Sequence, residues 1–136
     1  MSLYLPPKIL ILESQMIIAA DISMQLSKLG YEVIGIHIRV ERALKTIQLN
    51  RPDIILMNID TRSSTGGLNT ARYITKVLNI PMVFLSAHTD RAPLQQLIHL
   101  NTYALITKPF EIKDLQSSLE MTLRRMVAEG LWPTTQ

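Results

Sequence analysis

The stretch Pro52-Asp53-Ile54-Ile55-Leu56-Met57-Asn58 decides the fold of this chain. A proline precedes a short, continuous apolar run, and a polar side chain closes it. Such a run is too short for a typical helix and is typical of a parallel strand covered on both faces. Its last residue, Asn58, is therefore expected to emerge at the carboxyl edge of a sheet.

The rest of the chain repeats this unit in alternation with helical patterns. The predicted strands are Lys8–Leu12, Glu32–Ile36, Asp53–Met57, Met82–Leu85 and Ala104–Thr107. The predicted helices are Gln15–Leu29, Val40–Leu49, Leu68–Leu78, Arg91–Leu100 and Ile112–Val127. Short β-α connections predict a doubly wound, three-layer α/β fold with a parallel five-stranded sheet and right-handed crossovers.

Local signals support these boundaries. Ser14 is predicted as the N-cap of the first helix, and Gly30 stands where a helix end favours a left-handed residue. The polar segment from Thr61 to Gly67 is predicted as a loop. Residues 8–127 are expected to form the domain, with 1–7 as an N-terminal tail or tag remnant and 128–136 as a C-terminal tail or truncated linker.

Composition bounds the class of protein. With 136 residues, 47% hydrophobic and 18% charged, the chain suits one compact α/β domain. The absence of cysteine excludes a disulfide framework, a thiolate zinc site and a catalytic thiol. A net charge of +3 without a basic block argues against nucleic-acid binding by this domain. No apolar stretch approaches the ~20 residues of a membrane helix, and a cytoplasmic location is expected.

Polar side chains follow the predicted strands where functional groups collect in such sheets, beyond the carboxyl ends. Glu13 and Ser14 follow the first strand, Asn58 ends the third, Ser86 follows the fourth and Lys108 the fifth. Because parallel strands share this edge, these residues are expected to lie close together.

Five segments occur in an order and spacing that resemble a known family. They are Lys-Ile-Leu-Ile-Leu-Glu, Leu-Gly-Tyr-Glu-Val, Arg-Pro-Asp-Ile-Ile-Leu-Met-Asn, Ile-Pro-Met-Val-Phe-Leu-Ser-Ala-His and Thr-Lys-Pro-Phe. From about Lys8 to Arg125 the chain resembles the CheY-like receiver domain of two-component response regulators. The resemblance implies strand order 2-1-3-4-5 in a flavodoxin-like fold, and a role in phosphorelay signal transduction.

The resemblance assigns roles to the edge residues. It implies that Glu13 is the first acidic residue of the metal pocket, that Ser14 stands where a direct magnesium ligand is expected, and that Asn58 stands at the phosphoacceptor position. Ser86 and Lys108 match the phosphate-sensing hydroxyl and lysine.

Three further positions complete the comparison. Leu105 matches the aromatic switch residue, Asp60 contributes its backbone carbonyl to the metal-facing pocket in the family, and Gly66-Gly67 stands where an Asp-Gly pair is common. Leu105 lacks the ring and polar tip that give a switch two distinct states.

The chemistry of the substituted positions argues against phosphorylation. An amide oxygen is a poor nucleophile compared with a carboxylate, and magnesium loses its water reluctantly for neutral ligands. We therefore expect a pseudo-receiver with no enzymatic activity, no metal and no cofactor, binding magnesium weakly at most. A Lys108–Glu13 pair, bridged by Asn58 and Ser86, is expected to fill the pocket.

The resemblance also implies protein partners: a histidine kinase, an effector domain or a second receiver. In the family these commonly use the face built by the fourth helix, fifth strand and fifth helix, which here would include Gln95, Gln96, His99, Tyr103, Lys113 and Arg124.

Two alternatives stay open. One is a working magnesium-dependent phosphoacceptor in which position 58 is natively aspartate. The other is a flavodoxin-like small-molecule binder, which should carry a glycine-rich phosphate loop after the first strand. The sequence there, Glu13-Ser14-Gln15-Met16, contains no glycine.

Overall fold

A computed structural model of the chain describes residues 6–37, 39–59, 66–87, 100 and 102–133. Its strands are β1 (Lys8–Leu12), β2 (Glu32–His37), β3 (Ile54–Ile59), β4 (Met82–Ala87) and β5 (Ala104–Lys108). Its helices are α1 (Met16–Lys28), α2 (Val40–Leu49), α3 (Gly66–Lys76) and α5 (Ile112–Ala128). The helix predicted at 91–100 lies outside the described residues, apart from Leu100.

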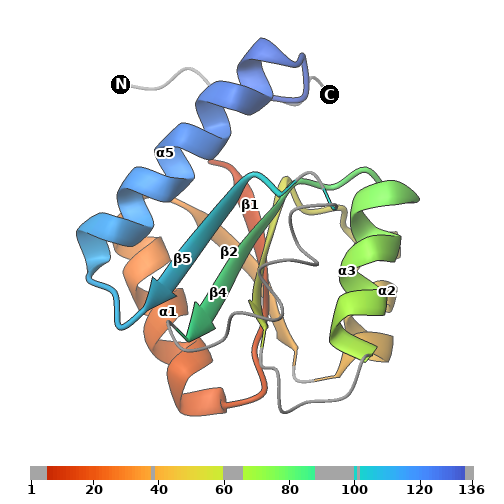
Figure 1. Cartoon of the computed structure of the whole chain (residues 1–136), viewed down its shortest axis with the longest axis horizontal. Helices are drawn as coiled ribbons and strands as arrows, with labels where there is room; N and C mark the ends of the chain where they lie inside the picture. The colour runs from red at the N-terminus through yellow and green to blue at the C-terminus, as the bar shows by residue number, and fades with distance from the viewer. Residues whose placement is uncertain (1–5, 38, 60–65, 88–99, 101, 134–136) are drawn as a thin grey trace.

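The strands form one parallel sheet in the order β2-β1-β3-β4-β5, which confirms the predicted topology. Helices α1 and α5 cover one side of it, and α2 and α3 cover the other (Figure 1). The central strand β3 is buried at every position except Asn58, which is half-buried.

Two hydrophobic cores lie on the two sides of the sheet, and strand alternation supplies both. Leu10, Ile55 and Phe84 pack into the core under α2 and α3. Ile9 and Leu56, one position away on their strands, pack into the core under α1 and α5. This two-sided burial explains why the strands read as continuous apolar runs rather than alternating ones.

Helix ends agree with the sequence in one case and correct it in another. Gly30 has a φ of +94°, and Tyr31 N–H donates to the Leu26 carbonyl, so a left-handed residue closes α1 as predicted. The predicted N-cap, Ser14, is wrong because Gln15 occupies that position. The buried Glu13 carboxylate accepts from the Gln15 N–H at 3.1 Å instead.

The third helix begins earlier than predicted. Gly66 and Gly67, expected in the loop, belong to the first turn of α3, and the helix ends at Lys76 rather than Leu78. Only the first turn is involved, where backbone N–H groups have no helical partner and glycine costs less than in a helix interior.

The C-terminal segment packs against the domain as far as it is described. Gly130 has a φ of +76° and Leu131 N–H donates to the Met126 carbonyl, so the chain turns back after α5. Trp132 packs on the α1–α5 core, and Leu131 lines a shallow pocket of about 330 Å³ with Tyr103. A domain boundary at 127 stays a prediction, although Glu129, Leu131 and Trp132 contact the domain.

Candidate functional site

The carboxyl edge of the sheet brings together three of the predicted site residues. Glu13 directly follows β1 and is 2% exposed, Asn58 lies near the end of β3, and Lys108 ends β5. Strand alternation explains the convergence: Ile11, Leu56 and Ile106, two positions earlier on each strand, all pack into the α1–α5 core. The three polar side chains thus leave the sheet on the same side.

Glu13 is the centre of this group. Its Oε1 accepts a hydrogen bond from Asn58 Nδ2 at 3.1 Å as well as the one from the Gln15 N–H. Lys108 Nζ lies 3.9 Å from Oε2, at the outer limit of an ion pair, and Oε2 has no hydrogen-bond partner among the described residues. The predicted Lys108–Glu13 pair and the contact of Glu13 with Asn58 are therefore present. Ser86, which was predicted to bridge the pair as well, lies in register with Ile59, on the α2–α3 side of the sheet.

The amide of Asn58 acts here as a donor. A carboxylate at this position could not donate, and it would place a second negative charge beside Glu13. The observed hydrogen bond satisfies one oxygen of a buried carboxylate, and burying that group without partners is costly. Asn58 thus fits the site as a stabilising neighbour of Glu13.

The other predicted residues occupy different positions. Ser86 is buried on β4 in register with Ile59, and alternation directs it to the α2–α3 side of the sheet, with Phe84. Ser14 is exposed. Leu105 is 37% exposed on β5, and Asp60 lies outside the described residues. The peptide bond between Lys108 and Pro109 is cis.

The described residues contain no group of three or more histidine, aspartate or glutamate side chains that could hold a metal ion. Glu13 is the one carboxylate that the structure brings to the described part of this edge. An octahedral, oxygen-demanding cation such as magnesium is poorly matched by one carboxylate whose Oε1 already accepts two hydrogen bonds.

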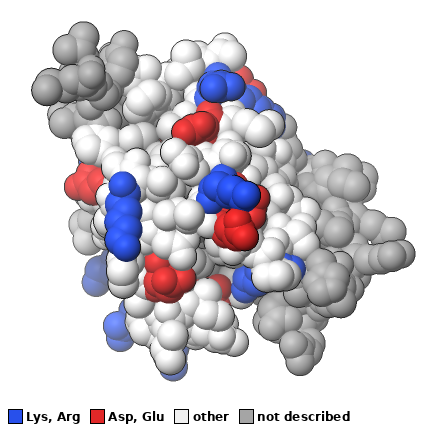
Figure 2. All heavy atoms as spheres, turned by 90° about the vertical axis from the view of Figure 1, so that its left-hand side faces the viewer, with Lys and Arg blue, Asp and Glu red and all other residues white. Residues whose placement is uncertain are grey.

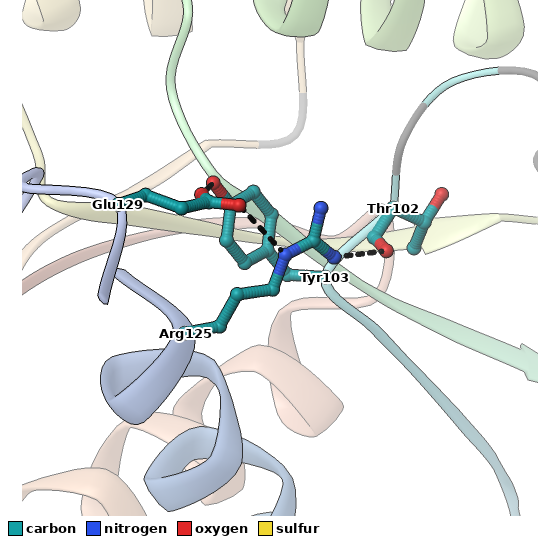
Figure 3. A network of polar contacts seen from close by, with 4 residues as sticks. All are labelled: Thr102, Tyr103, Arg125 and Glu129. Carbon is teal, nitrogen blue, oxygen red and sulfur yellow. Dashed lines mark hydrogen bonds and ion pairs between the residues drawn. The ribbon is translucent and has the colours of Figure 1, made fainter. Parts of the chain in front are cut away.

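A second polar cluster, which the sequence analysis did not identify, lies at the opposite edge of the sheet (Figure 3). The Tyr103 hydroxyl donates to Glu129 Oε1, and Arg125 Nε donates to Glu129 Oε2 at 3.1 Å. The Arg125 guanidinium lies 4.0 Å from the centre of the Tyr103 ring and also donates to the Thr102 carbonyl.

The contacts within this cluster shift the pKa values of Tyr103 and Glu129. Burial, and then the hydrogen bond to Glu129, raise the pKa of Tyr103 to about 12. The hydrogen bonds from Tyr103 and Arg125 lower the pKa of the Glu129 carboxyl. The spacing of four residues between Arg125 and Glu129 is visible in the sequence and indicates an ion pair along α5. The contact of this pair with Tyr103 depends on the fold and has no local sequence pattern.

The chain matches the response regulator receiver domain family over residues 9–120, and it belongs to that family of regulators in two-component signalling. It is 28% identical over 120 residues to the transcriptional regulatory protein PdtaR of Mycobacterium tuberculosis, covering 88% of this chain and 58% of that protein. It is 30% identical over 126 residues to the uncharacterized transcriptional regulatory protein YvcP of Bacillus subtilis, covering 90% and 51%. The chain thus spans about half the length of these curated relatives.

Solved structures agree with the fold. The signal receiver domain of a modulated diguanylate cyclase from Desulfovibrio desulfuricans G20 superimposes with a TM-score of 0.81 at 30% identity, covering 91% of this chain and 98% of that one. The N-terminal domain of a response regulator/sensory box/GGDEF protein from Carboxydothermus hydrogenoformans gives 0.78 at 33% identity, covering 90% and 98%. In the described part of the chain no helix is long and apolar enough to cross a membrane.

Proposed function

We propose that this chain is a receiver domain that works through protein contacts without phosphorylation of position 58. The observation that carries the proposal is the hydrogen bond from Asn58 Nδ2 to the buried Glu13. The amide occupies the position of the nucleophile, and its N–H group is committed to the one carboxylate of the described pocket. Acyl-phosphate formation needs a carboxylate there, and an amide does not replace it.

The pocket is also proposed to bind no magnesium at physiological concentration. Lys108 Nζ lies 3.9 Å from Oε2 of Glu13 and Asn58 donates to Oε1, so the buried charge has a cation and a donor without a metal. Ser14, at the position of a direct ligand, offers a neutral oxygen and is exposed.

The partner-binding role is proposed for the surface of β5 and α5. Lys113 and Arg124 are exposed on α5, Leu105 is exposed on β5, and Tyr103 is half-buried just before that strand. Gln95, Gln96 and His99 of the predicted face lie outside the described residues. A histidine kinase, an effector domain or a second receiver remains the expected class of partner, and a cytoplasmic location the expected compartment.

The test is treatment of the protein with acetyl phosphate, and separately with beryllofluoride, in millimolar magnesium. We expect no gain of mass and no change in the amide resonances of Asn58, Ser86 and Lys108. The matched variant is Asn58→Asp, which restores a carboxylate at one position and shows whether the assay detects acceptors in this fold. A stoichiometric phosphoryl adduct on the unmodified chain would refute the proposal and support the working phosphoacceptor.

A further inference from the structure

Charge is distributed differently over the two helical layers. Figure 2 views the side that carries α1 and α5, and it shows acidic and basic side chains interspersed among neutral ones. Along α2 and α3 the described charged side chains are nearly all basic and all exposed: Arg39, Arg42, Lys45, Arg72 and Lys76, against the single acid Glu41.

Helical geometry places the four cations within the helices, Arg42, Lys45, Arg72 and Lys76, on the outward faces. Ala43 and Ile47 of α2 are buried, as are Ala71 and Ile74 of α3, all in the same core. At about 100° per residue, the residues at positions 42, 45 and 49 of α2 and at 72, 73 and 76 of α3 point away from that core. The two helices therefore present neighbouring outward surfaces.

Arg51 fixes the C-terminal ends of the two helices next to each other. Its guanidinium donates to the Leu78 carbonyl at 2.7 Å and to the Asn79 carbonyl at 3.3 Å. Three apolar side chains are exposed near these ends: Leu49 (81%), Tyr73 (45%) and Val77 (60%). Cationic and apolar groups thus share one surface, which we call the α2–α3 face.

The cations of this face have no acidic partner within the described residues. The ion pairs among the described residues involve Lys108, Lys113 and Arg125, which all lie outside the α2–α3 face. Arg72 Nη1 donates to the amide oxygen of Asn69 at 3.4 Å. The uncompensated charge affects a neighbour, since burial and then the Arg42 guanidinium lower the pKa of His37.

We propose that the α2–α3 face docks an acidic segment of a protein partner. The basic side chains of the face favour a partner with acidic side chains. The exposed Leu49, Tyr73 and Val77 favour a protein over other anionic partners, because protein interfaces combine apolar centres, aromatic rings and arginine. Contacts with nucleic-acid phosphates need no apolar groups. A membrane surface is disfavoured because α2 and α3 already bury their apolar stripes in the core.

This docking surface lies apart from Asn58 and does not depend on the phosphorylation state of the carboxyl edge. If the peptide does not bind, the proposed function still stands, and if position 58 is phosphorylated, the docking proposal still stands.

The test uses the whole chain, isotopically labelled, and a synthetic helical peptide of about 20 residues with glutamate along one face and leucine beside it. Titration at about 0.15 M salt is followed by amide NMR, with the same peptide carrying glutamine for glutamate as reference. We expect saturable shifts confined to α2, α3 and the Arg51 loop. Arg72→Glu/Lys76→Glu should weaken binding at least about tenfold.

Two matched variants make the result decisive. Lys28→Glu, an exposed position on α1 outside both proposed surfaces, changes the net charge as much as Lys76→Glu alone and should leave the affinity unchanged, whereas Lys76→Glu should weaken it. Leu49→Ser/Val77→Ser removes exposed apolar groups and should also weaken binding. The proposal would be overturned if Lys28→Glu and Lys76→Glu lost affinity equally or if Leu49→Ser/Val77→Ser had no effect. It would also be overturned if no saturable shifts appeared, or if the α2–α3 face bound duplex DNA or phosphatidylserine vesicles as tightly as the peptide.

Discussion

Two polar clusters stand at opposite edges of the same sheet, and they are built on opposite principles. At the carboxyl edge, Glu13 is almost fully buried and depends on Asn58 and a lysine 3.9 Å away. At the amino edge, where the strands begin, Tyr103 and Glu129 form a dense group of contacts with Arg125 (Figure 3). This group is only partly buried: Tyr103 and Arg125 are half-buried and Glu129 is exposed.

The comparison shows that the number of contacts is a poor guide to their energetic weight. A buried charge that loses a partner is left with a desolvation penalty that nothing else offsets. Exposed groups that lose a partner are solvated again by water, so each contact contributes little. The sparse cluster should therefore control stability, and the dense one should control local conformation.

The largest effect is expected from Lys108→Met, which keeps the aliphatic stem and removes the charge beside Glu13. Breaking a fully buried pair costs about 3–5 kcal/mol, and the partial exposure of Lys108 and the long contact reduce the expected loss to about 2 kcal/mol. Urea unfolding measures it. Lys113→Met, in the exposed pair with Glu111, is the control and should change the free energy by less than about 0.5 kcal/mol.

A double variant separates charge from packing at this site. Glu13→Gln in the Lys108→Met background removes the orphaned carboxylate and should recover most of the lost stability. Equal stability of Lys108→Met and the unmodified protein would show that the carboxyl edge is no more sensitive than the surface.

Asn58→Asp should have the next largest effect. It replaces a donor to Glu13 with a second carboxylate, which destabilises the protein at pH 7 by about 1–2 kcal/mol. The repulsion raises the pKa of one carboxyl in the folded state, so the deficit should shrink as the pH falls through that raised value. Urea unfolding across the acid range, with and without magnesium, measures this; a deficit independent of pH would contradict it.

A smaller effect is expected for Tyr103→Phe at the other edge. The variant loses the hydroxyl donor to Glu129 and so loosens the segment that carries Trp132, the sole tryptophan of the chain. The fluorescence emission of Trp132 should shift to the red while the melting temperature changes little. Tyr73→Phe, on the exposed side of α3, is the control and should leave the emission unchanged.

The smallest effect is confined to alkaline pH. The pKa of Tyr103 is raised from 10.0 to about 12, so the protonated phenol is favoured in the folded state. The stability that it contributes is complete below pH 10 and is lost as the pH rises toward about 12. Burial also raises the pKa of Tyr31, so the test is the component of tyrosinate absorbance near pH 12, which Tyr103→Phe should abolish. Ionisation of Tyr103 near pH 10 would contradict the contact with Glu129.

The sequence predicted the carboxyl edge better than the amino edge, for a physical reason. Glu13, Asn58 and Lys108 each lie at or next to the carboxyl end of a recognisable strand, and parallel strands bring these ends to one edge. Tyr103 and Glu129 lie 26 residues apart on either side of α5, and no local pattern joins them. The error at Ser14 has a different origin, because the helix begins one residue later than predicted, with Gln15 at the N-cap and its N–H donating to the neighbouring Glu13 carboxylate.

The amino-acid sequence by itself determined the fold, because apolar runs with the period of strands and helices specify which faces must be buried. It also determined that position 58 carries an amide rather than a nucleophile. Only the tertiary structure decided what that amide does, which is to donate to Glu13, and how the basic residues of α2 and α3 come to share one surface. Those contacts join residues distant along the chain, and their geometry exists only once both cores have packed.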